Sequence, residues 1–152
     1  MNLQELGSLG EFIAAIAVIA SLIYLAVQIR QNTQSVRAST VQAISDAAQG
    51  RLLALHNVEN ARVWRIGRSE PTTLNEDERM LYIIMIQTSA RGFENLYYQH
   101  RSGLLDAPYW AGYDKTIKAL VKTDGFRYFW QHRRGRFSSE FESFIEESLS
   151  SS

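Results

Sequence analysis

Two arginine–histidine pairs are the residues whose types and spacing could perform chemistry. Arg127 precedes His132 in "RYFWQH", and Arg51 precedes His56 in "RLLALH". A histidine can act as general acid or base, and an arginine can stabilise charge that develops on a phosphate. With 13 arginines and three histidines in 152 residues, about one such pair is expected by chance. We therefore assign no catalytic residue and keep Arg127 and His132 as candidates. The alternative is that these two residues form a polar rim around Trp130 and that the other pair lies on a helix surface.

Two further charged segments have a structural interpretation beside a functional one. "QHRRGR", residues 131–136, could bind phosphate or an acidic lipid. It could instead pair with the glutamates that follow it, which are Glu140, Glu142, Glu146 and Glu147. "FENLYYQH" places Glu94 one helical turn from Arg91, with Tyr97 and Tyr98 on neighbouring turns. Buried tyrosine hydroxyls that meet charged partners would explain this segment without a ligand. We expect internal pairing in both segments.

The composition excludes several classes of site. The chain has no cysteine, which rules out disulfides, thiolate metal sites and cysteine nucleophiles. The three histidines form no i, i+4 pair and no cluster with carboxylates, and no glycine-rich phosphate loop or GxSxG motif occurs. The 16 basic and 16 acidic side chains give a net charge of zero, so no bulk charge attracts nucleic acid. We expect no cofactor, no metal and no nucleic-acid partner.

The elements that must position these residues begin with an apolar segment near the N-terminus. Residues 12–29 carry no charge, and only Ser21, Tyr24 and Gln28 among them are polar. As a helix, these 18 residues span roughly 27 Å, which is enough to cross the hydrocarbon core of a bilayer with little tilt. A cleaved signal peptide would begin with basic residues. The only charged side chains among the first 11 residues are two glutamates. A buried core helix is the other alternative. We predict a membrane span.

The flanking charges predict the orientation of this span. No lysine or arginine precedes it, whereas Arg30, Arg37 and Arg51 follow it, with no acid before Asp46. The positive-inside rule then places the short N-terminus outside and everything after Gln31 in the cytoplasm, as a single-pass signal anchor. Helical spacing of apolar residues continues from Val36 to Leu55 without proline, so we expect one long helix.

One face of this helix carries only small or polar residues, and we call it the seam. Its members are spaced by alternating fours and threes: Gly10, Ala14, Ala17, Ser21, Tyr24, Gln28, Gln31, Ser35, Ala38, Gln42 and Ser45. The opposite face of the span carries Phe12, Ile16, Ile19, Ile23 and Val27, as expected of a surface that faces lipid. Small residues let membrane helices approach one another closely. The seam therefore predicts either a packed contact between copies or the wall of a pore.

The rest of the chain predicts helices separated by short breaks and no strand. Helix starts are indicated by Asn75 followed by Glu78, by Asp106 followed by Pro108, and by Ser139 followed by Glu142. A break is expected at residues 57–60, and Gly67 followed by Pro71 is expected to end the helical segment after it. Further breaks are expected near Gly103, at "TDG" (residues 123–125) and at Gly135. About four helices then form a small bundle. We predict an all-α chain in which residues 1–40 hold the N-terminal tail, the transmembrane helix and its juxtamembrane extension, and residues 41–150 form a cytoplasmic helical bundle.

Several phrases taken together resemble a widespread family of uncharacterised bacterial single-span membrane proteins with a C-terminal helical domain. They are "LGEFIAAIAVIASLIYLAVQIRQNTQSVRAST", "LNEDERMLY", "RGFENLYYQHRSGLLD" and "DGFRYFWQHRRGRFSSEFESFIEE". More distantly, the plan is similar to the accessory membrane proteins of RNA-targeting CRISPR systems, which assemble into ring-like pores and carry an HEPN-like helical domain. HEPN ribonucleases use an arginine and a histidine four to six residues apart, so this resemblance implies a role for Arg127 and His132.

These observations predict a homo-oligomeric protein of the bacterial inner membrane rather than an enzyme. In the most specific version, the seam residues from Gly10 to Gln42 face a common axis and form or gate a pore, while the helical domain serves assembly or regulation. The expected partners are further copies of the chain, membrane lipid and an unknown cytoplasmic protein. Two alternatives stay open, a membrane-tethered HEPN-like ribonuclease and a membrane scaffold for a cytoplasmic partner.

Overall fold

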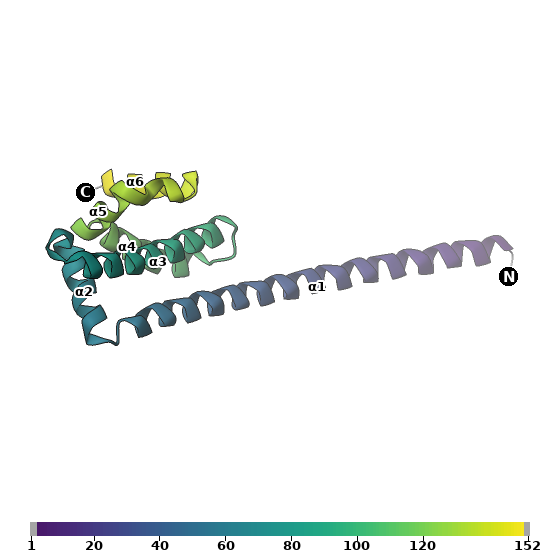
Figure 1. Ribbon diagram of the computed structural model, residues 1–152. Helices are drawn as coiled ribbons and strands as arrows, with labels where there is room; N and C mark the ends of the chain where they lie inside the picture. Colours follow the sequence, from purple (N-terminus) through teal and green to yellow (C-terminus); the bar gives the residue numbers. More distant parts are fainter. Residues whose placement is uncertain (1–2, 151–152) are drawn as a thin grey trace. The chain divides into compact units, whose positions relative to one another are not determined.

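The computed structural model describes residues 3–150, and these residues form helices and short connections without a strand (Figure 1). The predicted all-α class is confirmed. The elements in order are α1 (Leu3–Ala54), α2 (Val58–Ser69), the 3-10 turn η1 (Pro71–Thr73), α3 (Glu76–Arg101), α4 (Ala107–Val121), α5 (Asp124–Arg133), the 3-10 turn η2 (Arg134–Arg136) and α6 (Ser139–Ser150). The chain divides into two compact units, Met1–Ser39 and Thr40–Ser152.

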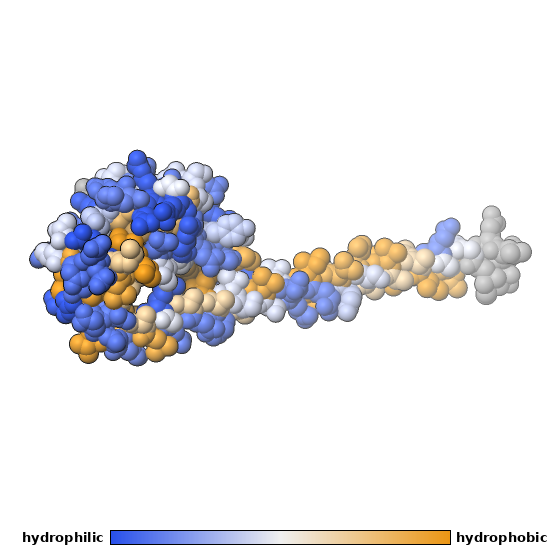
Figure 2. All heavy atoms as spheres, viewed as in Figure 1, coloured by the Kyte–Doolittle hydropathy of each residue, from blue (hydrophilic) through white to orange (hydrophobic). Residues whose placement is uncertain are grey.

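The first unit consists of the N-terminal part of α1. The helix runs without a break past Gln31 to Ala54, so the expected long helix is confirmed. No proline occurs before Pro71, and neither Gly7 nor Gly10 interrupts the helix. Apolar side chains gather along this part of α1 in Figure 2.

Side-chain caps start the helices of the second unit, which we call the helical domain. The Asn57 side chain accepts hydrogen bonds from the backbone N–H groups of Glu59 (2.8 Å) and Asn60 (3.4 Å) at the start of α2. At α3, Glu78 N donates to Asn75 Oδ1 (2.9 Å), and Asn75 N donates to Glu78 Oε2 (3.0 Å). This reciprocal pair is the predicted capping box.

The structure corrects three sequence-based boundaries. Gly67 lies inside α2, which continues to Ser69. "TDG" separates two helices, but Gly125 is already helical because the Thr123 hydroxyl accepts from Phe126 N (3.3 Å) and starts α5 at Asp124. At α6, Glu142 N donates to the carbonyl of Ser138 (2.9 Å), so the first turn begins one residue before the predicted Ser139 cap. With α5 counted as a helix, five helices rather than about four follow α1 among the residues that the structure describes.

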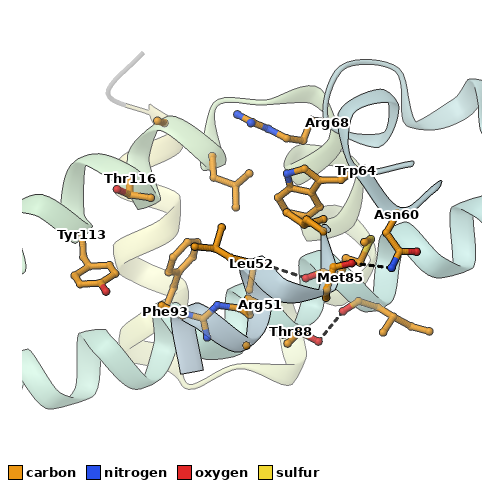
Figure 3. Close-up of a pocket in the computed structure, with 18 of the residues that line it drawn as sticks. Arg51, Leu52, Asn60, Trp64, Arg68, Met85, Thr88, Phe93, Tyr113 and Thr116 are labelled. Carbon is orange, nitrogen blue, oxygen red and sulfur yellow. Dashed lines mark hydrogen bonds between the residues drawn. The ribbon is translucent and has the colours of Figure 1, made fainter. Parts of the chain in front are cut away.

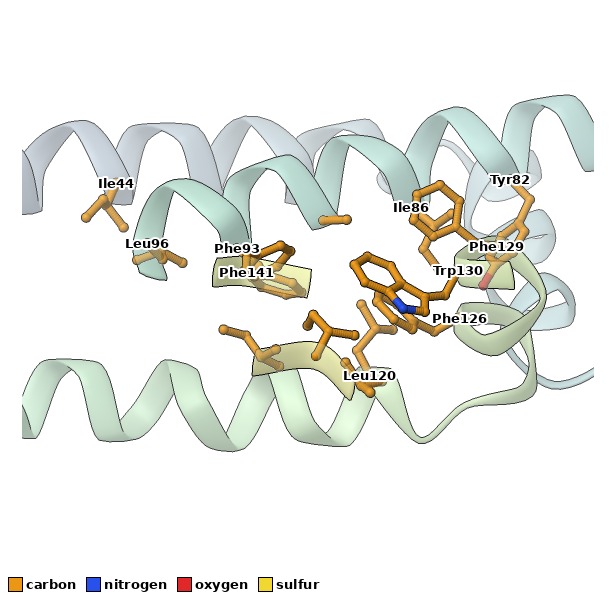
Figure 4. Close-up of a cluster of buried hydrophobic side chains, with 14 of the residues drawn as sticks. Ile44, Tyr82, Ile86, Phe93, Leu96, Leu120, Phe126, Phe129, Trp130 and Phe141 are labelled. Carbon is orange, nitrogen blue, oxygen red and sulfur yellow. The ribbon is translucent and has the colours of Figure 1, made fainter. Parts of the chain in front are cut away.

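The core of the helical domain is rich in aromatic side chains contributed by several helices (Figure 4). Phe126, Phe129 and Phe141 are fully buried, and Trp130 packs between Phe126 and Phe137 with ring centroids 5.6 and 5.3 Å away. Offset and tilted aromatic contacts of this kind add stability beyond the area that they bury. From the C-terminal part of α1, Ile44 joins this core and is 5% exposed.

Two glycines allow α2, α3 and α5 to approach closely. A Cβ at Gly67 would overlap the ring of Tyr82 on α3, and a Cβ at Gly125 would overlap the Gly67 carbonyl and the Tyr82 hydroxyl. Tyr82 is fully buried at this crossing. Only glycine leaves room for that ring, so both positions are fixed by packing rather than by a turn.

Candidate functional site

The N-terminal part of α1 holds an apolar stretch of membrane length. The 18-residue window that is long and apolar enough to cross a membrane is 0% buried. Four residues of the predicted lipid face are each more than half exposed, with Phe12 at 64% and Ile23 at 61%; the other two are Ile16 and Ile19. A core helix of a soluble domain would instead be mostly buried, so the structure disfavours that alternative. Length and composition make this helix compatible with a single-pass membrane protein.

The seam residues all lie on α1 and are solvent-accessible within one copy. The members from Gly10 to Gln42 are exposed, and Ser45 is half-buried. The Ser21 hydroxyl donates to the carbonyl of Ala17 at 2.8 Å. Because that donor is satisfied inside the helix, Ser21 can enter a water-free contact between helices at little cost. No side-chain hydrogen bond of Gln28 occurs within residues 3–150, so its amide depends on a group outside the copy.

The candidate pair on α5 does not converge within one copy. Arg127 and His132 are both exposed, and His132 Nδ1 lies 2.8 Å from the backbone carbonyl of Tyr128. Residues five apart in an α-helix point about 140° away from one another around the axis. The two side chains therefore leave α5 in different directions, and their catalytic role stays a prediction that would need residues of a second copy.

The second pair is separated by the end of a helix. Arg51 lies in the last turn of α1, whereas His56 lies in the exposed turn before α2. Arg51 is half-buried, and its guanidinium lies over Gly92 of α3, where a Cβ would come within 2.6 Å of Nη1. Arg51 therefore belongs to the packing of the helical domain rather than to a helix surface.

The expected pairing of Arg91 with Glu94 is confirmed and extends to the chain before α6. Arg91 Nη1 donates to Glu94 Oε2 at 2.7 Å, and Ser138 N donates to Glu94 Oε1 at 2.7 Å. Arg91 also donates to the carbonyl of Arg136 at 2.7 Å and lies 4.5 Å from the ring centroid of Phe137. Burial alone would raise the pKa of Glu94, but the bonds from Ser138 and Arg91 outweigh burial and hold the pKa below its ordinary value.

One arginine of residues 131–136 also takes part in internal pairing. Arg134 pairs with Glu146 at 3.3 Å, as the internal-pairing interpretation of residues 131–136 predicts. The expectation that buried tyrosine hydroxyls after Glu94 meet charged partners is wrong for the described residues, because Tyr97 is only half-buried and no hydrogen bond joins the hydroxyl of Tyr97 or Tyr98 to a glutamate or arginine. Tyr97 packs against Phe144 with centroids 4.9 Å apart, but Tyr98 is 63% exposed because it lies on the outer side of α3.

The helical domain contains a pocket that was not foreseen from the sequence (Figure 3). It has a volume of about 830 Å³. Its walls come from residues 48–55 of α1 and from α2, α3 and α4, and are mainly apolar; they include Leu52, Trp64, Ile84, Met85, Phe93 and Leu120. Leu52 (62%) and Ile84 (56%) stay exposed.

Three cations and no carboxylate line this pocket. The cations are Arg51, Arg68 and Lys115. Within residues 3–150, no hydrogen bond or ion pair satisfies the side chains of Arg51 and Arg68, and Nε of Arg68 is buried without a partner. Arg62 of α2, by contrast, pairs with Glu59 and Glu78.

Tyr113 lines the same pocket as Arg51. Burial raises the pKa of Tyr113, the neighbouring Tyr109 hydroxyl raises it further, and the Arg51 charge opposes both only in part. The hydroxyl therefore stays protonated at neutral pH and can donate a hydrogen bond. Sequence reasoning missed this pocket because its walls come from four helices far apart in the chain.

The part of the chain that the structure describes contains no group of three or more histidine, aspartate or glutamate side chains able to hold a metal ion. Comparison of the chain with protein-family models, with curated proteins and with solved structures found no match. The resemblance drawn from the sequence phrases therefore stays a prediction, and the function has to be argued from the chain itself.

Proposed function

We propose that the chain is a single-pass membrane protein that assembles into homo-oligomers through the seam of α1 and carries the helical domain on the cytoplasmic side. The observation that carries this proposal is the charge-free stretch of residues 12–29, which is exposed along its whole length within one copy. In water, an uncovered apolar surface of this size is unfavourable, so lipid or further copies must cover it.

The seam favours self-association over a solitary anchor. Its spacing of alternating fours and threes repeats every seven residues, whereas an α-helix needs slightly more than seven for two turns. The seam therefore drifts by about 20° per heptad, and copies that keep it in contact wind around one another with a left-handed twist. Small side chains at Gly10, Ala14 and Ala17 permit the close approach that membrane helices need.

The orientation follows from Arg30 and Arg37, which flank the C-terminal end of the stretch, and from the absence of lysine and arginine before it. The bacterial inner membrane is proposed as the location because of the sequence resemblance described above.

Disulfide cross-linking tests the seam directly, since the chain has no cysteine of its own. Ala17→Cys places a thiol on the seam, and Ala15→Cys places one about 160° away on the same helix, which makes it the matched control. With oxidant in native membranes, we expect a covalent dimer for Ala17→Cys and little or none for Ala15→Cys. Equal cross-linking of both variants, or none of either, would contradict a seam contact.

A pore is the second candidate, and the side chain of Gln28 favours it. This amide lies in the span without a hydrogen-bond partner in its own copy, and it could face either another copy or water. If copies surround a water-filled axis, reconstituted protein should conduct ions, and Ser21→Leu or Gln28→Leu should reduce the conductance. Silent bilayers that contain well-folded oligomer would leave a packed seam as the function of these residues.

A further inference from the structure

We infer that the pocket of the helical domain binds an amphipathic anion, with an aliphatic chain against the apolar walls and a carboxylate head group on Arg51. The site lies wholly within residues 48–120. It therefore does not depend on the function proposed for the N-terminal part of α1.

The size and lining of the pocket set the class of ligand. A volume of about 830 Å³ lies in the range of small-molecule sites and is lined mostly by aliphatic and aromatic side chains. Leu52 and Ile84 keep more than half of their surface exposed at this pocket. An aliphatic chain that covered them would remove apolar surface from water, which is favourable in proportion to the area covered.

The charge of the lining sets the head group. Arg51, Arg68 and Lys115 contribute positive charge, and no aspartate or glutamate lines the pocket. Partly buried cations without acceptors are unfavourable, and a bound anion relieves that cost. A neutral apolar ligand would leave these charges unpaired, and an inorganic anion would leave the apolar walls in water. Only a molecule with both parts can cover the apolar walls and also pair with one of these cations.

The position of Arg51 makes it the residue that binds the head group. Its guanidinium lies over Gly92, because glycine leaves the space above α3 that a Cβ would fill. Figure 3 shows Arg51 beside Phe93, with Tyr113 on the neighbouring helix, while Arg68 approaches from α2.

Calorimetric titration of the full chain in lipid nanodiscs tests this inference, with empty nanodiscs as the blank for partitioning. The probes are decanoate and decanol, which share the chain and differ in the charge of the head group. We expect saturable binding of one decanoate per chain and at least tenfold weaker binding of decanol. Arg51→Gln should weaken decanoate binding roughly ten- to a hundredfold, the usual effect of losing one charged hydrogen-bonded pair, and should leave decanol binding unchanged. Arg65→Gln, an exposed arginine of α2 that does not line the pocket, is the matched control.

Fluorescence provides a second readout that does not need a variant of Arg51. Trp64 lines the pocket, whereas Trp110 and Trp130 do not. Bromine-labelled decanoate should quench the fluorescence of the wild-type chain and of Trp110→Phe, but not that of Trp64→Phe. Equal affinities for decanoate and decanol, no saturable binding, or quenching that persists in Trp64→Phe would each overturn the inference.

Discussion

The ring of Tyr82 on α3 occupies the space that a Cβ at Gly67 on α2 would fill. The same tyrosine reaches Gly125 on α5, so three helices meet at one buried aromatic side chain. Burial also raises the pKa of the Tyr82 hydroxyl, which has no hydrogen-bond partner among the residues described. The crossing is therefore held by shape rather than by polar contacts.

Gly67→Ala should destabilise the helical domain by about 1–3 kcal/mol, because the added methyl group forces α2 away from the Tyr82 ring. All three tryptophans lie in this domain, so thermal unfolding followed by tryptophan fluorescence measures the effect. Gly112→Ala is the control, since Gly112 is exposed inside α4 and nothing lies within 4 Å of its Cβ position. That variant should be as stable as wild type or up to about 1 kcal/mol more stable. Equal destabilisation by both substitutions would show that the loss of stability comes from a change in helix propensity and not from the Tyr82 contact.

Glu78 should make the stability of the helical domain depend on acidic pH. The hydrogen bond from Arg62 holds the pKa of Glu78 below its ordinary value, and the bond from Asn75 N lowers it further. A lowered pKa means that the unfolded chain takes up the proton first as the pH falls. The stabilisation is therefore present at neutral pH and is lost as the pH drops through and below the ordinary range of a glutamate, about 4.3.

The measurement compares wild type with Glu78→Gln in unfolding experiments between pH 7 and pH 3. The variant should be less stable at pH 7, and the difference should shrink towards pH 3. Glu76→Gln is the control because Glu76 lies in the same first turn of α3 and is exposed, so it shares the helix dipole without the Arg62 contact. A difference that stays constant with pH would be inconsistent with this account.

Glu94→Ala should cost about 1–3 kcal/mol, because it removes the acceptor of both Ser138 N and Arg91 and leaves these donors without their bond. Glu146→Ala removes the carboxylate of the Arg134 pair, in which both side chains are more than half exposed. Pairs of that kind contribute about 0–1 kcal/mol. Chemical denaturation of both variants distinguishes the two positions, and equal losses would mean that the Ser138 contact adds no stability.

Single cysteines should report the orientation of the span. We expect a membrane-impermeant maleimide to label Ser8→Cys from outside intact cells and to label Ser102→Cys, exposed after α3, only after the membrane is opened. Ala20→Cys lies within the apolar stretch and should react in neither case. The reverse pattern for the first two positions would show the opposite orientation, and ready labelling of Ala20→Cys would argue against burial in a bilayer.

Local signals in the sequence predicted most of the secondary structure. The capping box of Asn75 and Glu78 depends on residues three apart, and the length of the apolar stretch depends only on consecutive residues. Such features depend on residues that are close in the chain, so they can be predicted without knowledge of the tertiary structure. Boundaries failed where tertiary packing intervened: Gly67 was predicted to end α2, yet it is retained inside the helix because Tyr82 needs the space.

The sequence by itself determined the all-α class, the membrane-length helix with its seam, and the pairing of Arg91 with Glu94, because each follows from residues within a few turns of one helix. Only the tertiary structure decided which arginines lack an acceptor. Arg51 and Arg68 lie on different helices, and whether a carboxylate reaches them depends on how α1, α2, α3 and α4 pack. The seam is determined only in part by the sequence. Its residues follow from their spacing in the chain, but what covers them depends on contacts beyond a single chain.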